Sequence, residues 1–448
     1  MTAVEEGYLD HEGVRLHYLQ WHGDAERRPA ILALHGLSSN ARIWERLAAR
    51  LPGRRLVALD QRSHGPSDRP AQGYGAAQVV ADAAHAIVRL DLGRPLIVGH
   101  SWGASIALEL AATRPELAAG LVFVDGPAAA MTRLMTWEDV QRIMQPPLPR
   151  YDSYEEAERA LAASLGAAYG PDLQAFVRAG LRHEDGEYRS ALTAPVRLEI
   201  LRAMYHYQPE ALFPQVQGPV LLALAGAMEL RSRAAAPGEV APAEVAPVPA
   251  GTARQRWRRE AAEAVLSMQP AASVIWYDSP HDIPLFRPSE LAEDVERMAI
   301  AAGFWDVGWR AAGLDGDWSV RVHDEGEWSA RQLLAHLAST QTALPQVLRT
   351  EPAQQTGEPF DPDRWNASQV RRRQGASPAA LIEELLQASA ALRAVLHEEN
   401  LRHPAAIGPY AGRQLTEVME RMLAHQQTHV ATLAEALRAP QTPAATTP

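Results

Sequence analysis

The sequence predicts an α/β domain followed by an all-helical domain. Between residues 7 and 225, short apolar runs alternate with longer segments of helical periodicity, which is typical of a mostly parallel sheet covered by helices. Beyond Gly303 the strand-like runs disappear, and helical apolar stripes continue to Ala439. A length of 448 residues agrees with roughly two or three domains of ~150 residues each. We therefore expect an α/β domain at 1–302 and a helical domain at 303–439.

Two antiparallel strands are expected to open the first domain. Residues 8–21 alternate between apolar and polar side chains and are broken at Glu12 and Gly13, as in a hairpin. Buried parallel strands follow, because each later run is short, apolar on both faces and ends in Gly, His or Asp. These runs occupy residues 31–34, 56–59, 96–98, 121–124 and 220–224, with a last strand at 273–277 and a closing helix at 288–301.

Two segments interrupt the predicted sheet. Residues 128–217 separate the fourth and fifth runs, are rich in Ala, Leu, Arg and Glu, and are predicted to form a helical cap. Residues 234–251 are low in complexity and rich in Ala and Pro, with too few bulky apolar groups to pack. We predict that they form a mobile insertion within the first domain.

Three long helical patterns define the second domain, at residues 329–348, 378–399 and 415–438. In the middle pattern, apolar residues recur at spacings of four and three and form a single face. The residues on this face are Leu381, Leu385, Ala388, Leu392 and Val395. The tail at 440–448 is expected to be disordered.

The composition limits the chemistry. All 43 basic residues are Arg, and the chain has neither Lys nor Cys. This excludes Schiff-base and P-loop lysines, thiolate nucleophiles, cysteine zinc ligands and disulfides. A net charge of −11 repels phosphate backbones, and the densest basic clusters, at 256–259 and 371–373, are short. We expect no nucleic-acid partner.

The sequence shows no sign of a membrane or of export. The N-terminal residues are acidic where a secretory signal needs basic residues and an apolar run. No stretch approaches the ~18 continuous apolar residues of a membrane span. We therefore expect a cytoplasmic protein without a membrane partner.

A candidate nucleophile lies at Ser101, in the sequence Gly99-His100-Ser101-Trp102-Gly103. This G-x-S-x-G follows an apolar run and precedes a helical segment, where the glycines allow a tight turn that exposes the serine next to a helix N-terminus. Residues 1–302 here resemble the α/β-hydrolase family.

The resemblance implies partners for Ser101. The family's oxyanion turn matches His35-Gly36-Leu37, so the backbone N–H groups of Leu37 and Trp102 would receive the oxyanion. The family's histidine loop matches residues 279–285, which implies His281 as the general base.

The acid of the triad is left open between two residues. The family usually places an Asp three residues after the Gly that ends the penultimate strand, and Glu229 stands there. Some members use an earlier position, which is Asp125 here. Glu229 is the leading candidate and Asp125 the alternative; Glu can orient a histidine as Asp does, although its longer side chain needs a shifted loop.

A serine at the elbow favours acyl transfer to water through an acyl-serine intermediate, since dehalogenases and epoxide hydrolases of this fold require Asp there. The first expectation is hydrolysis of a small-molecule carboxylic ester or lactone. Hydrolysis of amides or C–C bonds and perhydrolysis use the same residues and remain alternatives.

A candidate metal site lies in the second domain. His425 and His429 stand four apart on one face of the last helical pattern, so their imidazoles can reach one ion. Together with His336 in the pattern Leu333-Leu334-Ala335-His336-Leu337, these histidines resemble the DinB-like four-helix bundle family over residues 305–438. The resemblance implies Zn²⁺ or Ni²⁺ bound by the three histidines and chemistry with a small thiol.

Three functions follow from these observations. The leading one is a serine hydrolase fused to a metal-binding bundle. The second is a metal-dependent, thiol-using transferase or isomerase, with the hydrolase domain processing a related substrate. The third is a bundle that serves only as a scaffold for a homodimer. Because the chain has no cysteine, a thiol used at the metal must come from a separate small molecule.

Overall fold

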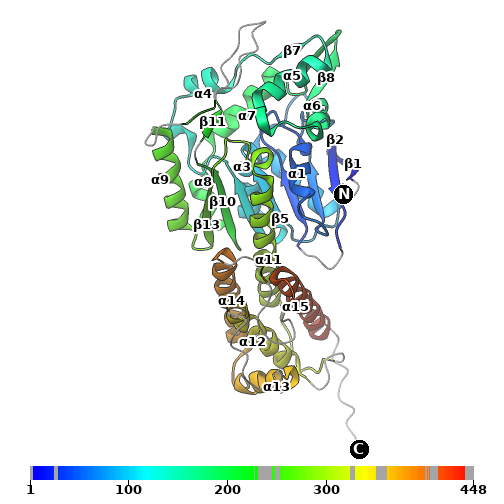
Figure 1. Ribbon diagram of the computed structural model, residues 1–448. Coiled ribbons are helices and arrows are strands. Elements are labelled where there is room, and N and C mark those ends of the chain that lie inside the picture. The colour runs from blue at the N-terminus through cyan, green and yellow to red at the C-terminus, as the bar shows by residue number, and fades with distance from the viewer. Residues whose placement is uncertain are drawn as a thin grey trace, which may run out of the picture. The chain divides into compact units, whose positions relative to one another are not determined.

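The computed structural model describes residues 4–24, 29–226, 228–230, 245–247, 253–322, 328–349, 361–398, 401, 403 and 412–438. The chain divides into two compact units, Met1–Ala299 and Ile300–Pro448. The first is an α/β unit and the second is helical, as predicted (Figure 1).

An eight-stranded sheet organises the first unit, in the order β1-β2-β4-β3-β5-β6-β10-β13. The first two strands form the predicted hairpin, and β2 also pairs antiparallel with β4, whereas every pairing from β4 to β13 is parallel. The strands are β1 (Val4–His11), β2 (Val14–Trp21), β3 (Ile31–Leu34), β4 (Leu56–Leu59), β5 (Leu96–His100), β6 (Gly120–Val124), β10 (Val220–Ala225) and β13 (Ala272–Tyr277). All predicted strands are thereby confirmed.

The central strands are completely buried, which explains their unbroken apolar sequences. Every residue of β3, β4, β5, β6 and β10 is buried. Helix α3 (Trp102–Thr113) packs against β5 and β6, and α2 (Ala76–Arg89) packs beside α3. A strand buried on both faces has no polar side to alternate with, so its sequence is continuously apolar.

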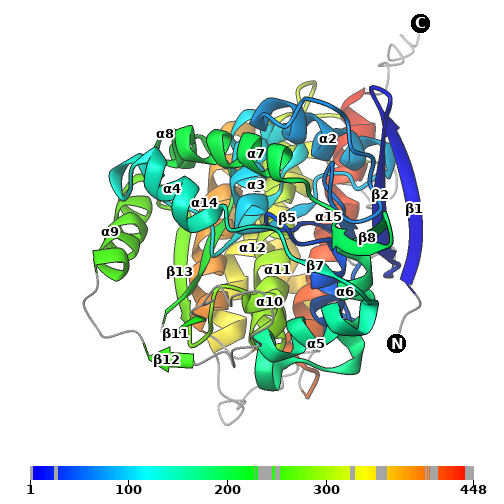
Figure 2. The ribbon, with the colours of Figure 1, turned by 90° about the horizontal axis from the view of Figure 1, so that it is seen from above.

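The cap segment, residues 128–217, lies between β6 and β10 and is mainly helical, as predicted. Tyr207 Oη donates a hydrogen bond to the carbonyl of Ser105 in α3 (3.0 Å), and Asn40 Nδ2 donates to the carbonyl of Phe176 in the cap (3.0 Å). Figure 2 looks onto these helices. They are α4 (Trp137–Met144), α5 (Tyr154–Leu165), α6 (Gln174–Ala179), α7 (Ala194–His206) and α8 (Pro209–Leu212).

The cap also contains a small antiparallel sheet that the sequence analysis missed. Its order is β7-β9-β8, from β7 (Arg150–Tyr151), β8 (Leu181–Glu184) and β9 (Glu187–Ser190). Asp185 and Gly186 turn the chain between β8 and β9 with φ angles of 54° and 81°, as a tight Asp-Gly hairpin requires. The strands are short and half-exposed, so they lack the apolar alternation that identifies a strand from sequence.

The Ala/Pro-rich segment 234–251 falls largely outside the described residues. Within it the structure describes only β12 (Val245–Pro247), which pairs antiparallel with β11 (Met228–Leu230). Helix α9 (Ala253–Met268) follows and leads into β13. The tail 440–448, predicted to be disordered, also lies outside the described residues.

The helical unit is built from the later part of α11 (Pro288–Ala312) with α12 (Ala330–Arg349), α13 (Pro362–Arg372), α14 (Pro378–Glu398) and α15 (Leu415–Arg438). The predicted helices at 329–348, 378–399 and 415–438 are confirmed. Helix α12 begins with a capping pair, because Gln332 N donates to Ser329 Oγ (3.3 Å) and Ser329 N donates to Gln332 Oε1 (2.8 Å).

Helix α11 is longer than expected, because it does not end near residue 301. It continues through Gly303 to Ala312. A Cβ atom at position 303 would lie 2.4 Å from Cδ2 of Leu423 in α15. The glycine therefore permits close contact between two helices, which offsets its low helix propensity. In the described part of the chain, no helix is long and apolar enough to cross a membrane.

Candidate functional site

Ser101 occupies a strained turn between β5 and α3. Its φ and ψ are 55° and −117°, outside the regions that most residues adopt. A Cβ at Gly99 would lie 2.3 Å from the carbonyl oxygen of Gly103, and a Cβ at Gly103 would lie 2.3 Å from that of Leu34. The two glycines therefore allow strand and helix to approach closely enough for this turn. It presents the serine at the N-terminus of α3, as in a nucleophile elbow.

The predicted oxyanion turn lies directly beside Ser101. A Cβ at Gly36 would lie 3.0 Å from Cβ of Ser101, so only glycine fits between them without a shift. Trp102 is the first residue of α3, whose N–H group has no intrahelical acceptor. Among the described residues, the N–H group of Leu37 has no acceptor either. Both predicted donor groups are thus without an acceptor among the described residues.

Two buried histidines hold the oxyanion turn in place. His35 Nδ1 donates to the carbonyl of Gly36 (2.8 Å), and its Nε2 accepts the N–H of Gln61 (3.1 Å). His64 Nδ1 donates to the carbonyl of Arg62 (3.0 Å), and its Nε2 accepts the N–H of Ser38 (3.1 Å). Each ring uses one nitrogen as donor and the other as acceptor, which defines a neutral tautomer. Burial, with His35 nearby, lowers the pKa of His64 to about 3.

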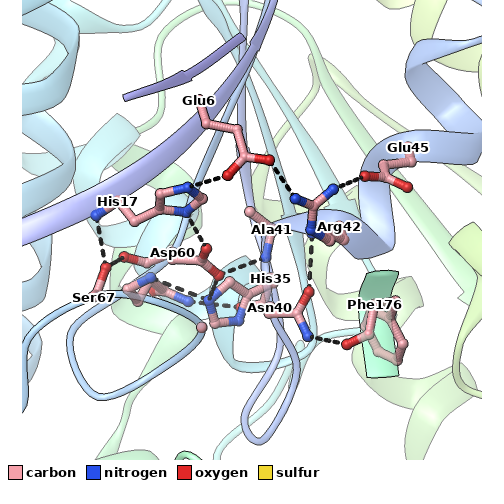
Figure 3. A network of polar contacts seen from close by, with 12 residues as sticks. Glu6, His17, His35, Asn40, Ala41, Arg42, Glu45, Asp60, Ser67 and Phe176 are labelled. Carbon is pink, nitrogen blue, oxygen red and sulfur yellow. Dashed lines mark hydrogen bonds and ion pairs between the residues drawn. The ribbon is translucent and has the colours of Figure 1, made fainter. Parts of the chain in front are cut away.

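Asp60 connects the oxyanion turn to the sheet. Its carboxylate accepts the N–H of Ala41 (2.7 Å) and Nδ1–H of His17 (2.7 Å), and the Asp60 carbonyl accepts the hydroxyl of Ser67 (2.6 Å) (Figure 3). In the same network Arg42 bridges Glu6 and Glu45. These contacts give the loop after β4 an architectural role.

His64 should make the folded protein sensitive to acid. In the unfolded chain a histidine titrates near pH 6.5, whereas folded His64 stays neutral down to about pH 3. Between these values only the unfolded state gains the proton, so stability falls as the pH falls, by about 1.4 kcal/mol per pH unit. We expect His64→Gln to lessen the pH dependence of the urea midpoint between pH 6.5 and 5. The exposed His206→Gln is the control, and an unchanged pH dependence in His64→Gln would contradict the prediction.

The structure brings His281 to Asp125. Nδ1 of His281 lies 2.6 Å from Oδ2 of Asp125, which is buried. Oδ1 of Asp125 accepts the N–H of Ala225 (2.8 Å) and also contacts the guanidinium of Arg258 in α9. Strand pairing sets this position, because His100 and Val124 are register partners in β5 and β6, so Ser101 and Asp125 follow at the same sheet edge.

The leading acid candidate, Glu229, lies in β11, and its side chain is outside the described residues. The structure therefore shows a contact between His281 and the alternative candidate, Asp125. The side-chain contacts of Glu229 cannot be compared with it, because that side chain is not described.

His100 anchors the loop that carries His281. Its Nε2–H donates to the carbonyl of His281 (3.0 Å), and the two rings lie 4.8 Å apart between centroids. Burial, with a contribution from neighbouring His281, lowers the pKa of His100 to about 4. Because His100 is neutral, it donates to the His281 loop without placing a positive charge beside the imidazole of His281.

The three predicted metal-binding histidines converge in the helical unit. Nε2 of His425 lies 3.3 Å from Nε2 of His336 and 3.0 Å from Nε2 of His429, and ligand atoms of all three lie within 4.8 Å of one another. Nitrogens bound ~2.0–2.1 Å from one ion at angles of 90–110° lie about 2.9–3.4 Å apart. The cluster therefore has the donor type and spacing of a metal centre.

The surroundings keep two of the three histidine donors, His336 and His429, neutral. Burial and the two neighbouring histidines lower the pKa of His336 to about 3, and burial lowers that of His429 to about 4. The ring of Trp328 packs 5.1 Å from His336, while His425 is exposed. Neutral imidazoles are the form that binds metal, and the exposed side leaves access for a further ligand.

We expect purified protein to contain about one divalent metal ion per chain, and His429→Ala to lose it, because removing one of three imidazoles breaks the donor set. Elemental analysis after exhaustive dialysis measures the metal. His403→Ala, which replaces a histidine outside the cluster, should retain it. Equal metal content in wild type and His429→Ala would rule out this site.

Sequence reasoning missed two side chains that contact the candidate site residues or their supporting loop. Arg258 contacts Asp125 from helix α9, and His64 supports the oxyanion turn from the loop after β4. Neither residue belongs to a motif that indicates a site: Arg258 stands in the short basic cluster at 256–259, and His64 lies in a loop. Their roles depend on which loops the sheet order brings together.

Two families match parts of the chain. Residues 29–208 match the family described as alpha/beta hydrolase fold, and residues 306–433 match the DinB superfamily. The first range lies within residues 1–302 and the second within residues 303–439.

Curated proteins match a shorter part. The chain is 41% identical over 98 residues to 2-(acetamidomethylene)succinate hydrolase of Mesorhizobium japonicum, which covers 22% of this chain and 35% of that protein. It is 36% identical over 137 residues to lipase LipV of Mycobacterium tuberculosis, covering 31% and 50% respectively. The chain thus spans half or less of the length of these two relatives.

Solved structures support the fold of the first unit. The crystal structure of E-2-(acetamidomethylene)succinate hydrolase aligns with a TM-score of 0.53 at 21% identity, covering 66% of this chain and 99% of that one. A thioesterase domain from the curacin biosynthetic pathway aligns with a TM-score of 0.51 at 18% identity, covering 65% and 99%. At these identities the likeness concerns the fold alone.

Proposed function

Because the chain joins an α/β-hydrolase-fold domain to a DinB superfamily domain, we propose that it is a serine hydrolase that cleaves a carboxylic ester or lactone. The observation that carries this proposal is the contact between His281 and Asp125 at the sheet edge where Ser101 occupies its strained turn. The proposed nucleophile, base and acid follow three different strands, and strand register with the His281–Asp125 contact supports bringing them together.

The proposed reaction uses these groups in sequence. Ser101 Oγ attacks the acyl carbonyl and passes its proton to Nε2 of His281, while Asp125 holds the Nδ1–H side and stabilises the imidazolium. The N–H groups of Leu37 and Trp102 stabilise the oxyanion. His281 then protonates the leaving alcohol, and a water molecule, deprotonated by the same histidine, releases the acid from Ser101.

Asp125 is the acid in this proposal. Its carboxylate is within hydrogen-bond distance of His281 and is fixed on its other oxygen by Ala225 N–H. Such fixing is what the third member of a triad needs, because its function is to hold the imidazole in one tautomer and orientation.

The relatives favour hydrolysis as the reaction class. Both curated proteins described above are named for hydrolysis, one of 2-(acetamidomethylene)succinate and the other as a lipase. Their different substrates leave the acyl group of this chain's substrate open, and an ester or lactone is the simplest substrate for a serine nucleophile.

A second function is proposed for the helical unit, on the convergence of three imidazoles. His336, His425 and His429 would hold Zn²⁺ or Ni²⁺, since imidazole suits both. A bound divalent ion would supply Lewis-acid chemistry and lower the pKa of a small thiol. The three residues would hold the ion through one imidazole nitrogen each, and His425, the exposed one, would form the accessible side of the site. If the purified protein contains no metal, the alternative is favoured in which the helical unit serves only as a dimerisation scaffold.

A panel of acyl esters and lactones, assayed with and without chelator, tests both functions. We expect hydrolysis that chelator does not alter, because no triad member belongs to the metal cluster. Hydrolysis that disappears with chelator and returns with metal would contradict the independent serine mechanism. Transfer to an added small thiol that requires the metal would support the second function.

A further inference from the structure

Arg258 contacts the carboxylate that also binds His281. The guanidinium lies against Oδ1 of Asp125, whereas His281 Nδ1 lies 2.6 Å from Oδ2. The Asp125 side chain is only 3% exposed and that of Arg258 19% exposed, so solvent screens the contact weakly. The arginine comes from α9, between the Ala/Pro-rich segment and the last strand.

Two other titratable groups, His100 and Asp282, lie near His281. His100, from the end of β5, is buried and neutral because its pKa is lowered to about 4. Asp282, the next residue on the same loop, lies 3.8 Å from Nε2 of His100 and is more than one-third exposed. Arg258 is thus the positive charge that the described residues place closest to the His281–Asp125 pair.

The positive charge of Arg258, in contact with the carboxylate of Asp125, affects the protonation of His281. It stabilises the ionised carboxylate, and it repels the imidazolium that His281 becomes on accepting a proton. A unit charge roughly 6 Å from a titrating group, in an effective dielectric of roughly 40, changes its titration midpoint by about one pH unit. Removing Arg258 should therefore make His281 easier to protonate.

We propose that Arg258 is a positioning residue that holds the carboxylate of Asp125 and keeps His281 in its neutral, proton-accepting form at lower pH. This inference deepens the proposed function and rests on it, since it assigns a fourth residue to the same site. The arginine extends the activity of the hydrolase toward acid. Arg258 and the N–H group of Ala225 both donate to Oδ1 of Asp125, and together they limit rotation of the carboxylate.

The test is a titration of His281 in the full-length protein. Histidine labelled with ¹³C in the ring is followed by NMR, and the His281 signal is assigned by its loss in His281→Gln. We expect Arg258→Gln to raise the midpoint by about one pH unit, and the acidic limb of kcat/KM for an acyl ester to move by the same amount. Arg258→Lys keeps the charge and should keep the midpoint of the wild type.

The controls separate charge from structure. Arg259→Gln removes an exposed arginine next to Arg258 on α9 and should change neither measurement. Arg258→Met, which keeps the aliphatic stem, replaces Arg258→Gln if the latter does not fold. Unchanged midpoints in both neutral variants, or equal shifts in Arg258→Lys and Arg258→Gln, would overturn the inference. A protein that hydrolyses no ester but shows the shift would contradict the proposed function and leave the role of Arg258 intact.

Discussion

Replacing Ser101 by alanine is expected to lower kcat for p-nitrophenyl acyl esters by about 10⁵–10⁶-fold, because the substitution removes the proposed nucleophile and leaves the other proposed groups unchanged. The residual rate would come from the oxyanion donors and from substrate binding. Alanine should fit the turn as well as serine does, since Ser101 donates only its backbone N–H to the sheet, to the carbonyl of Val124 (2.8 Å). The measurement is initial-rate kinetics on both proteins, purified side by side.

A matched control lies one turn further along α3. Ser105 is buried on the same helix, and its hydroxyl has no hydrogen-bond partner among the described residues, so Ser105→Ala should retain most of the activity. Circular dichroism and the thermal midpoint establish that each variant is folded. If folded Ser101→Ala hydrolyses the esters as fast as the wild type, the serine mechanism is wrong and another group performs the reaction.

Asp125→Asn is expected to lower kcat by about 10⁴-fold, because an amide favours the wrong tautomer of His281 and cannot stabilise its imidazolium. The shape of the side chain is nearly unchanged, so the contact with Ala225 N–H can be kept through the amide oxygen. The loss should appear in kcat more than in KM, since the carboxylate acts on the base and not on the substrate.

Comparing the activity of Glu229→Gln with that of Asp125→Asn identifies which carboxylate is the acid of the triad. If Asp125 is the triad acid, we expect Glu229→Gln to keep activity within about tenfold of the wild type. The reverse result, a large loss in Glu229→Gln and a small one in Asp125→Asn, would return the role to Glu229. Equal losses of a few-fold in both variants would mean that neither carboxylate orients His281.

Much of the fold followed from local patterns. The strands at residues 31–34 and 56–59 were predicted to the residue, because a strand buried on both faces must be apolar throughout. The elbow at Ser101 was recognisable because its geometry depends on two nearby glycines. The sheet in the cap was missed because its short polar strands carry no such pattern. The length of α11 was underestimated because a glycine inside a helix looks like a boundary unless its neighbour, Leu423, is known.

The sequence by itself indicated an α/β part and a helical part, the candidate nucleophile Ser101, the candidate base His281 and the three histidines that cluster, since each depends on residue type and spacing within one element or its adjoining loop. Only the tertiary structure decided that Asp125 contacts His281, across 156 residues, and that Arg258 shares that carboxylate. Strand order caused this outcome: β6 pairs beside β5, which puts Asp125 at the same sheet edge as Ser101. Contacts between distant segments depend on pairing and packing, whose geometry no local pattern encodes.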